Sequence, residues 1–419
     1  MFAQLVTGRF STSVYTFEKF DTVDVSKVFA RGFQTLQLGI SEGDVSLNTS
    51  LYGVSNLSRS FGDNVAIRIN NLFLRWRNIA NTVDVNVGRV PIFAGVGNGT
   101  VDGALIKARG WDKKIVLSTY GGTSVLSDIK STGFEDVDKN FFIGGQLIGS
   151  FVNNFRFGLS YMNRHIQRES YTALRPDSLF NSIPVLVAPD SRAEQALGVD
   201  ARYGGSSMLS VYGRYDYDLN FKRSRRVQGH VRFTVTEQIG LTAEYNYREP
   251  RIAYNSFFRI FPTSPIREYE GGIEYSSNSS IRASGKFAYV KYSRENSKRF
   301  IAGIYTDYGS ARFSGTDGYA GELSSVDIQG MYPLFNRVLI PTVGFSFASY
   351  RLEAAQIDRE DILAGSLGAV VRPIPDISGD VQVQWLRNTV AENDVRLYAK
   401  LNYWFSHNLD LFNRNEVGK

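Results

Sequence analysis

The sequence of 419 residues contains no cysteine and only three histidines, His165, His230 and His407. The absence of cysteine excludes a disulfide scaffold, a thiolate metal site, a cysteine nucleophile and covalent attachment of a c-type haem. Three widely spaced histidines are too few for a histidine metal cluster. A lipase of the membrane surface would need a serine–histidine pair on its outer face, whereas His230 falls among polar, inward-type positions. We therefore expect no metal, no cofactor and no enzymatic activity.

Long apolar runs are also missing. A membrane-spanning helix needs roughly 18–20 consecutive apolar residues, whereas the longest apolar run, residues 183–189, is short and interrupted by proline. Charged residues make up 21% and hydrophobic residues 43% of the chain, so neither a disordered chain nor a helical membrane bundle fits.

An excess of charge of one sign is absent as well. The 47 basic and 41 acidic residues give a net charge of +6, and the bases are dispersed among acids. The densest basic cluster, residues 222–226, is short. This distribution argues against a nucleic-acid partner.

Aromatic residues are abundant (29 Phe, 23 Tyr and 4 Trp), and apolar residues alternate with polar ones along most of the chain. Successive side chains of a strand point to opposite faces, so a wall between lipid and water must alternate in this way. No long window has a helical period of 3.6. One clear example sets Leu209, Val211, Tyr215 and Tyr217 against Ser210, Tyr212, Arg214, Asp216 and Asp218.

The connectors between the alternating segments fall into two length classes. Short connectors are expected at 42–43, 78–82, 110–112, 152–154, 204–207, 236–238, 276–280, 333–336 and 373–376. Longer ones are expected at 54–64, 91–102, 122–138, 165–193, 219–226, 250–265 and 352–360. Such segregation is typical of an outer-membrane barrel, with short periplasmic turns and long extracellular loops. A jelly roll or a propeller would alternate less strictly.

These segments predict an all-β fold, a single closed antiparallel transmembrane β-barrel with 18 to 22 strands and 22 as the best value. Segment 308–320 gives the weakest strand, because it is rich in glycine and serine. Within the fourth strand, Ile67 and Ile69 share one parity and Leu72, Leu74 and Trp76 the other. A bulge at Asn70-Asn71 explains this change, and two short strands are the alternative.

The last strand, residues 395–405, carries one unbroken apolar parity that ends in the aromatic pair Tyr403 and Phe405. This pair resembles the C-terminal signal of bacterial outer-membrane barrels of the porin type. Residues 83–89, a strand that ends in Gly-Arg before a glycine-rich segment, resemble porin sequences too. The resemblance covers residues 5 to 405 and identifies no subfamily.

The resemblance implies a barrel at 1–405, a periplasmic tail at 406–419, recognition of Tyr403 and Phe405 by the barrel assembly machinery, and residence in a Gram-negative outer membrane. Residues 1–4 have neither the basic start nor the apolar core of a signal peptide. We therefore expect that the export signal has been removed.

Charged residues at polar positions are expected to line the lumen. The basic ones are Arg156, Arg202, Arg214, Arg232, Arg248, Arg282 and Lys286, and the acidic ones are Asp200, Asp216, Asp218, Glu244, Glu268, Glu270 and Glu274. A basic ladder that faces acids across the pore would sort solutes by charge. The alternative is that these residues form ordinary ion pairs between neighbouring strands, worth about 0–1 kcal/mol each.

Three segments are candidates to narrow such a lumen: Pro91–Gly103 with its four glycines, His165–Arg192 with its apolar stretch, and Arg251–Pro265 with its aromatics. The apolar stretch of the second should fold into the lumen, pack on the rim or contact a partner. Sugar stacking on the aromatics of the third is conceivable, but collapse of the loop is favoured.

The sequence favours a porin, a passive diffusion channel for small hydrophilic solutes. Two alternatives stay open: a barrel that is a sheath or platform for a partner, such as an electron-transfer cytochrome or a secretion component, and a structural or adhesive surface barrel. The expected partners are the lipid bilayer, the assembly machinery and the solutes, and a homo-oligomer or protein partner is left open.

Overall fold

The computed structural model describes residues 4–22, 25–58, 65–125, 137–167, 170–176, 178, 180–187, 194–204, 208–250, 264–277, 280–293, 295–319, 321–352 and 358–409. Within these ranges the only helical element is a single 3-10 turn, η2 (Phe335–Arg337). No helix among them is long and apolar enough to cross a membrane, a finding that does not bear on strands.

The described residues form 24 strands. Their bounds are β1 Gln4–Thr22, β2 Val25–Glu42, β3 Val45–Asn56, β4 Val65–Ile79, β5 Val83–Ala94, β6 Gly97–Gly110, β7 Ile115–Ser124, β8 Asn140–Gly149, β9 Phe155–Ile166, β10 Tyr171–Pro176, β11 Ser182–Val187, β12 Glu194–Tyr203, β13 Leu209–Asp218, β14 Arg223–Thr234, β15 Ile239–Arg248, β16 Ile266–Ser276, β17 Arg282–Lys291, β18 Asn296–Thr306, β19 Gly309–Gly318, β20 Glu322–Met331, β21 Leu339–Arg351, β22 Glu360–Ile374, β23 Ile377–Arg387 and β24 Asp394–Leu409.

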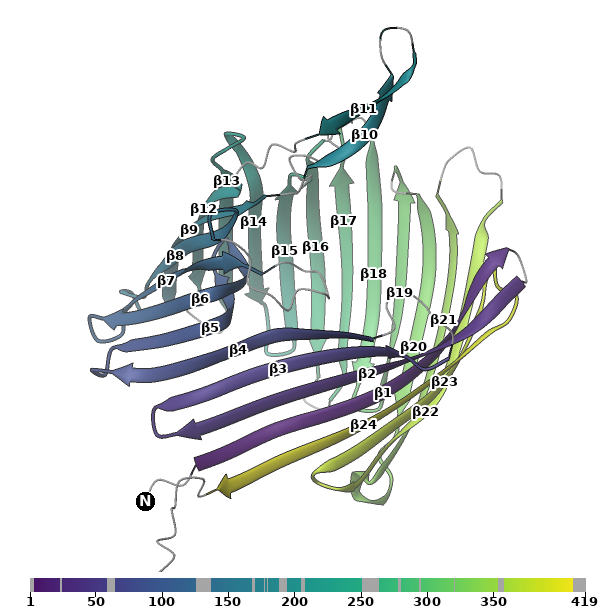
Figure 1. Ribbon diagram of the computed structural model, residues 1–419. Coiled ribbons are helices and arrows are strands. Elements are labelled where there is room, and N and C mark those ends of the chain that lie inside the picture. The colour runs from purple at the N-terminus through teal and green to yellow at the C-terminus, as the bar shows by residue number, and fades with distance from the viewer. Residues whose placement is uncertain are drawn as a thin grey trace, which may run out of the picture.

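Twenty-two of these strands form one closed antiparallel barrel. Each strand pairs with the next along the chain, β9 pairs with β12, and β1 pairs with β24 from Gln4↔Leu409 to Tyr15↔Tyr398. Figure 1 shows the continuous wall, with β24, β1, β2 and β3 on one side and β15 to β18 on the other. The predicted closed barrel of 22 strands is confirmed.

The two faces of the wall differ as the alternation predicts. Phe287, Val343 and Leu367, all on the outer parity, are 51%, 52% and 68% exposed, and they form part of an apolar outer surface. Asn70 is skipped in the register between β3 and β4, where Ser50 pairs with Asn71 and Leu51 with Ile69. The bulge predicted at Asn70-Asn71 is therefore present, and it keeps Ile69 and Leu72 on the same outer face.

The connectors agree with the prediction at one end of the barrel and only partly at the other. The expected short turns all join strands at the end where β1 begins and β24 ends. At the opposite end the long connectors 57–64, 125–139, 167–193, 249–265 and 352–359 are present, but two to four residues join the pairs β1–β2, β5–β6, β13–β14, β17–β18 and β19–β20. The expected longer connector at 219–226 is therefore wrong, because β14 begins at Arg223. The predicted long loop at 91–102 is wrong, because β5 and β6 run to a two-residue turn at Gly95-Val96. The weak segment 308–320 contains strand β19.

Three further expectations concern loops and the tail. Strands β10 and β11 form a separate hairpin within the segment 165–192, and Figure 1 shows it beyond the end of the wall rather than in the lumen. Its Leu174 and Leu186 are exposed. Residues 251–263 and 410–419 lie outside the described ranges, while β24 continues past residue 405 to Leu409.

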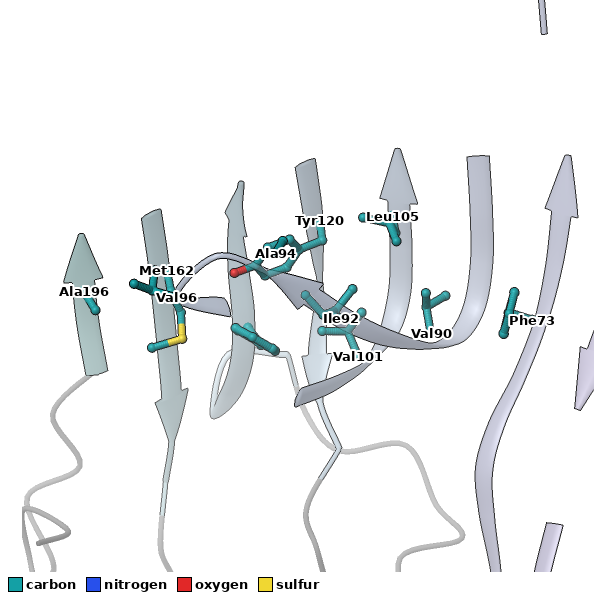
Figure 2. Packing of buried hydrophobic residues seen from close by; sticks show 11 residues of the cluster. Phe73, Val90, Ile92, Ala94, Val96, Val101, Leu105, Tyr120, Met162 and Ala196 are labelled. Atoms are coloured by element: carbon teal, nitrogen blue, oxygen red, sulfur yellow. The ribbon is translucent and has the colours of Figure 1, made fainter. Parts of the chain in front are cut away.

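The buried apolar core lies against the inner face of the wall, under the tip of the β5–β6 hairpin. Figure 2 shows Ile92, Ala94 and Val96 of this hairpin near Tyr120 and Met162. The cluster comprises Phe73, Val90, Ile92, Ala94, Val96, Val101, Leu105, Tyr120, Phe142, Met162 and Ala196, from seven strands. Ile92 and Phe142 are completely buried. The hairpin therefore adds a second layer to one side of the barrel.

Candidate pore lining

The β5–β6 hairpin leaves the wall at its glycines. β4 and β5 pair only from Leu72↔Arg89 to Ile79↔Val83, so β5 departs from β4 beyond Arg89. Gly88 has a φ of 126°, and a Cβ there would overlap with the carbonyl oxygen of Leu72. Glycine is required where the backbone takes this conformation at such close approach.

A buried ion pair closes the base of the hairpin. Arg89 donates from Nε and Nη2 to the two carboxylate oxygens of Asp102, both at 2.7 Å, and from Nη1 to the carbonyl oxygen of Ile69 at 3.2 Å. The side chains of Arg89 and Asp102 are only 7% and 6% exposed. This bidentate pair joins β5 to β6 and ties both to the bulged part of β4.

Polar contacts hold the tip of the hairpin to the far side of the cluster. The backbone N–H of Val96 donates to Ser160 Oγ of β9 at 3.1 Å, and Arg214 of β13 donates to the carbonyl oxygen of Gly95 at 3.2 Å. The hairpin therefore crosses the inner face from β4 to β13. Because two packed sheet layers lie about 10 Å apart, it narrows the lumen by roughly that amount on one side.

Four of the predicted basic residues lie one on each of the successive strands β12 to β15, namely Arg202, Arg214, Arg232 and Arg248. All four are on the inner parity, but three of them pair with nearby acids of the same wall. Arg214 bonds Asp216 at 2.9 Å, Arg232 bonds Glu274 at 3.1 Å, and Arg248 lies 3.6 Å from Glu268. Arg202 instead faces Arg156 across β9 and β12. Only Arg248–Glu268 joins neighbouring strands, as the alternative expects, since Asp216 lies on the same strand as Arg214 and Glu274 lies two strands from Arg232.

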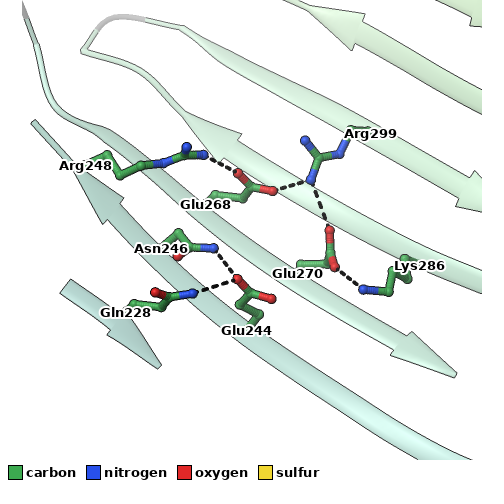
Figure 3. A network of polar contacts seen from close by, with 8 residues as sticks. All are labelled: Gln228, Glu244, Asn246, Arg248, Glu268, Glu270, Lys286 and Arg299. Atoms are coloured by element: carbon green, nitrogen blue, oxygen red, sulfur yellow. Dashed lines mark hydrogen bonds and ion pairs between the residues drawn. The ribbon is translucent and has the colours of Figure 1, made fainter. Parts of the chain in front are cut away.

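The inner face of β15 to β18 carries a connected network of charges (Figure 3). Arg299 bonds both Glu268 and Glu270, the latter at 3.0 Å, and Lys286 bonds Glu270 at 2.9 Å. Glu244 accepts hydrogen bonds from the side-chain amides of Asn246 and Gln228 at 2.5 and 3.5 Å. On this side acids and bases largely neutralise each other.

The remaining predicted residues are also on inner-parity positions. Asp200 faces Arg214 in the register of β12 and β13, although Arg214 bonds Asp216 instead. Asp218 accepts hydrogen bonds from the backbone N–H groups of Asn220 and Phe221, so it stabilises the turn before β14. Arg282 lines a pocket of about 440 Å³ near the short-turn end, together with the Arg232–Glu274 pair.

The charged inner face is accessible to solvent. The side chain of Arg248 is 60% exposed, that of Arg232 is 48% exposed and that of Glu274 is 36% exposed. Because the barrel wall is closed, these side chains face a polar interior that water enters.

Sequence reasoning missed three features of this lining. Arg299 directly follows Lys298, so two charged residues interrupt the alternation of apolar and polar residues. The apolar residues Phe300 and Ile304 of β18 lie on the outer face, and Arg299 has the opposite parity, so it could have been assigned to the inner face. The Arg89–Asp102 pair was missed because a glycine-rich segment was taken for a loop. Arg9, near the start of β1, was not assigned to the lumen.

The predicted assembly signal lies on the closing strand. Tyr403 and Phe405 of β24 are neighbours on the outer parity, with ring centroids 5.7 Å apart. Tyr403 faces Phe10 of β1, and the ring of Phe405 covers Gly8. Both aromatic rings therefore pack at the seam between the last strand and the first.

Neither the models of known protein families nor the curated proteins include a match to this sequence. Solved structures do match. The translocation pore of the P pilus usher PapC is 8% identical, with 96% of this chain and 99% of that chain covered and a TM-score of 0.51. The FrpB iron transporter from Neisseria meningitidis is 12% identical, with coverage of 96% and 81% and a TM-score of 0.50.

A third match is the E. coli P pilus tip assembly intermediate PapC-PapD-PapK-PapG, at 7% identity and a TM-score of 0.54. The match covers 94% of this chain and 60% of the matched chain. At such identities the matches establish the fold alone. The chain has the fold of the bacterial outer-membrane barrels of the porin type, as the resemblance predicts, and its subfamily is not identified.

Proposed function

We propose that this protein is an outer-membrane channel that lets small hydrophilic solutes diffuse passively across the membrane. The observation that carries the proposal is a closed wall whose outer face is apolar and whose inner face bears charged side chains accessible to solvent. Lipid cannot hydrogen-bond with backbone groups, and a closed barrel satisfies all of them. Strands of 10 to 19 residues are long enough to cross a bilayer when tilted.

The β5–β6 hairpin supports a channel with a fixed constriction. It is part of the wall, is anchored at its base by a buried ion pair and at its tip by Ser160 and Arg214, and covers the inner face of several strands. A polar lumen narrowed on one side favours small solutes over macromolecules. The paired charges on the wall predict weak rather than strong charge selectivity.

The proposal includes the location and the assembly route. The end of the barrel where β1 begins and β24 ends, with its short turns, would face the periplasm. The opposite end, with the long connectors, would face the exterior. Tyr403 and Phe405 would be read by the assembly machinery.

Conductance in a planar lipid bilayer tests the proposal. The purified, refolded barrel should give stable open steps in potassium chloride, and its gel mobility should change on heating. A correctly folded, heat-modifiable protein that carries no current would overturn the channel.

A sheath for a protein partner is the second candidate, and one observation favours it. The PapC usher is described as a translocation pore, and its structure matches 96% of this chain with a TM-score of 0.51. Such a role would place a polypeptide in the lumen. A barrel that is silent in the bilayer and copurifies with a stoichiometric protein partner would support the sheath instead of the diffusion channel.

A further inference from the structure

A pocket of about 260 Å³ opens on the inner face of the seam, where β24, β1, β2 and β3 adjoin. It is lined by Arg9, Ser11, Ser13, Phe33, Thr35, Gln37, Tyr52 and Lys400. The lining residues lie on the opposite face of their strands from the apolar outer residues Phe10, Leu36 and Leu401. The pocket therefore faces the lumen.

The lining carries two cations and no carboxylate. Among the described residues, the Arg9 guanidinium bonds only the amide oxygen of Asn402, at 2.7 Å, and its Cζ lies 5.2 Å from the centroid of the Trp404 ring. Its Nε is buried without a hydrogen-bond partner. Lys400 forms no ion pair within the part of the chain that the structure describes, not even with Asp380, its cross-strand neighbour on β23. Asp380 is therefore the nearest acid to Lys400 in the register, but neither Arg9 nor Lys400 is bound to a carboxylate among the described residues.

This lining contrasts with the opposite wall. On β14 to β18, Arg232, Lys286 and Arg299 each bond a glutamate, and Figure 1 places those strands across the lumen from β1. A cation that is already paired with a carboxylate has little net charge and few free donors with which to bind an anionic solute. The cations of the seam pocket keep their donors available.

Neutral donors and an aromatic surface complete the pocket. Arg9 is held in place by Asn402, which also accepts from Ser11 Oγ at 2.7 Å and donates to Ser378. Ser13 is the cross-strand neighbour of Lys400, and Thr35 and Gln37 of β2 face Ser11 and Arg9. Phe33 and Tyr52 stack at one side, with centroids 6.4 Å apart. Arg9 and Lys400 can bind an anionic group, the polar side chains can hydrogen-bond with the hydroxyl groups of a ligand, and the aromatic rings can pack against its carbon atoms.

We propose that this seam pocket is a binding site for small hydroxylated organic anions, such as sugar acids, on their way through the lumen. The inference rests on the proposed channel and names its preferred class of solute. The anionic group binds Arg9 and Lys400, and its hydroxyls exchange hydrogen bonds with Ser13, Thr35 and Gln37. A neutral sugar of the same size lacks the first contact.

Gluconate and glucose are the probes, applied to the full chain in a planar bilayer. Gluconate should interrupt the current in a concentration-dependent manner, and glucose should not. The double variant Arg9→Gln/Lys400→Gln should need about tenfold or more gluconate for the same effect, because two charge-assisted contacts are lost. The matched control Lys107→Gln/Arg312→Gln removes two inner-face charges outside the pocket and should behave like the wild type.

The outcomes separate the pocket from the channel. Equal interruption by glucose, or an unchanged concentration dependence in the Arg9/Lys400 variant, would overturn the site while leaving the channel intact. If the wild type carries no current, the channel fails, and calorimetric titration of gluconate into the detergent-solubilised barrel then decides the site alone. Gluconate binding that is present in the wild type and lost in the Arg9→Gln/Lys400→Gln variant supports the pocket. Absence of gluconate binding to the wild type refutes it.

Discussion

Replacing Asp102 by asparagine removes the carboxylate that binds the buried guanidinium of Arg89. Both side chains are less than one-tenth exposed, and the pair uses both carboxylate oxygens at 2.7 Å. Removal of one partner of a buried ion pair typically costs about 3–5 kcal/mol. That cost falls on the position of the β5–β6 hairpin, because the pair joins β5 to β6 and, through the bond to Ile69, to β4.

A penalty of this size shifts the equilibrium between a seated and a released hairpin by a factor of roughly 150 to 5,000. The strands outside the hairpin keep their own pairing, so the barrel should still fold. We expect Asp102→Asn to give a noisy current with additional conductance levels, whereas the wild type gives steady openings. Single-channel recording measures this directly, and the temperature of heat modification on gels reports any loss of global stability.

The double variant Arg89→Met/Asp102→Leu separates the charge from the shape. It removes both buried charges and keeps apolar volume, so most of the penalty should disappear. The carbonyl oxygen of Ile69 loses a donor, which costs about 1–3 kcal/mol, and the current should therefore be steadier than in Asp102→Asn. A single variant as quiet as the wild type, or a double variant noisier than the single one, would refute the reasoning.

Three other changes test the lining. Gly103→Ala forces a Cβ into the carbonyl oxygen of Gly121 on β7, so a smaller heat-modifiable fraction is expected on gels; a wild-type fraction would contradict this close approach. Joint replacement of Arg202, Arg214, Arg232 and Arg248 by glutamine removes four positive charges from the inner face, three of them from ion pairs, and the reversal potential should move toward cation selectivity; an unmoved potential would exclude these arginines from ion selection. Asn402→Ala removes the acceptor of Arg9 and Ser11, and about fivefold to tenfold more gluconate should be needed, with the conductance unchanged.

The sequence predicted the wall well because strand alternation is a local signal. Each outer-facing apolar residue is defined by its immediate neighbours, and even the bulge at Asn70 left a readable change of parity between Ile69 and Leu72. The same pattern constrains the register of the folded wall, since a slip of one residue would turn every apolar side chain inward.

The hairpin and the ion pairs were beyond that signal. Val96 is buried near Met162, Ala196 and Gly198, from strands more than 60 residues away, and no local pattern marks a second layer. Glycines at 95, 97 and 99 were taken as loop residues, whereas they permit close packing against Ser160, Tyr120 and Phe142. Partner choice among inner charges depends on side-chain reach, so Arg214 bonds Asp216 of its own strand rather than Asp200 opposite it.

The seam between β1 and β24 has a consequence for the order of folding. Every other pairing in the barrel joins strands that follow each other closely, apart from the detour through β10 and β11. The contact between Arg9 and Asn402 spans 393 residues, and it cannot form until the last strand has been delivered. Because pairings of such separation are slow to form, the seam pocket exists only in a finished barrel. A solute that binds there would also favour the closed ring over its open precursor.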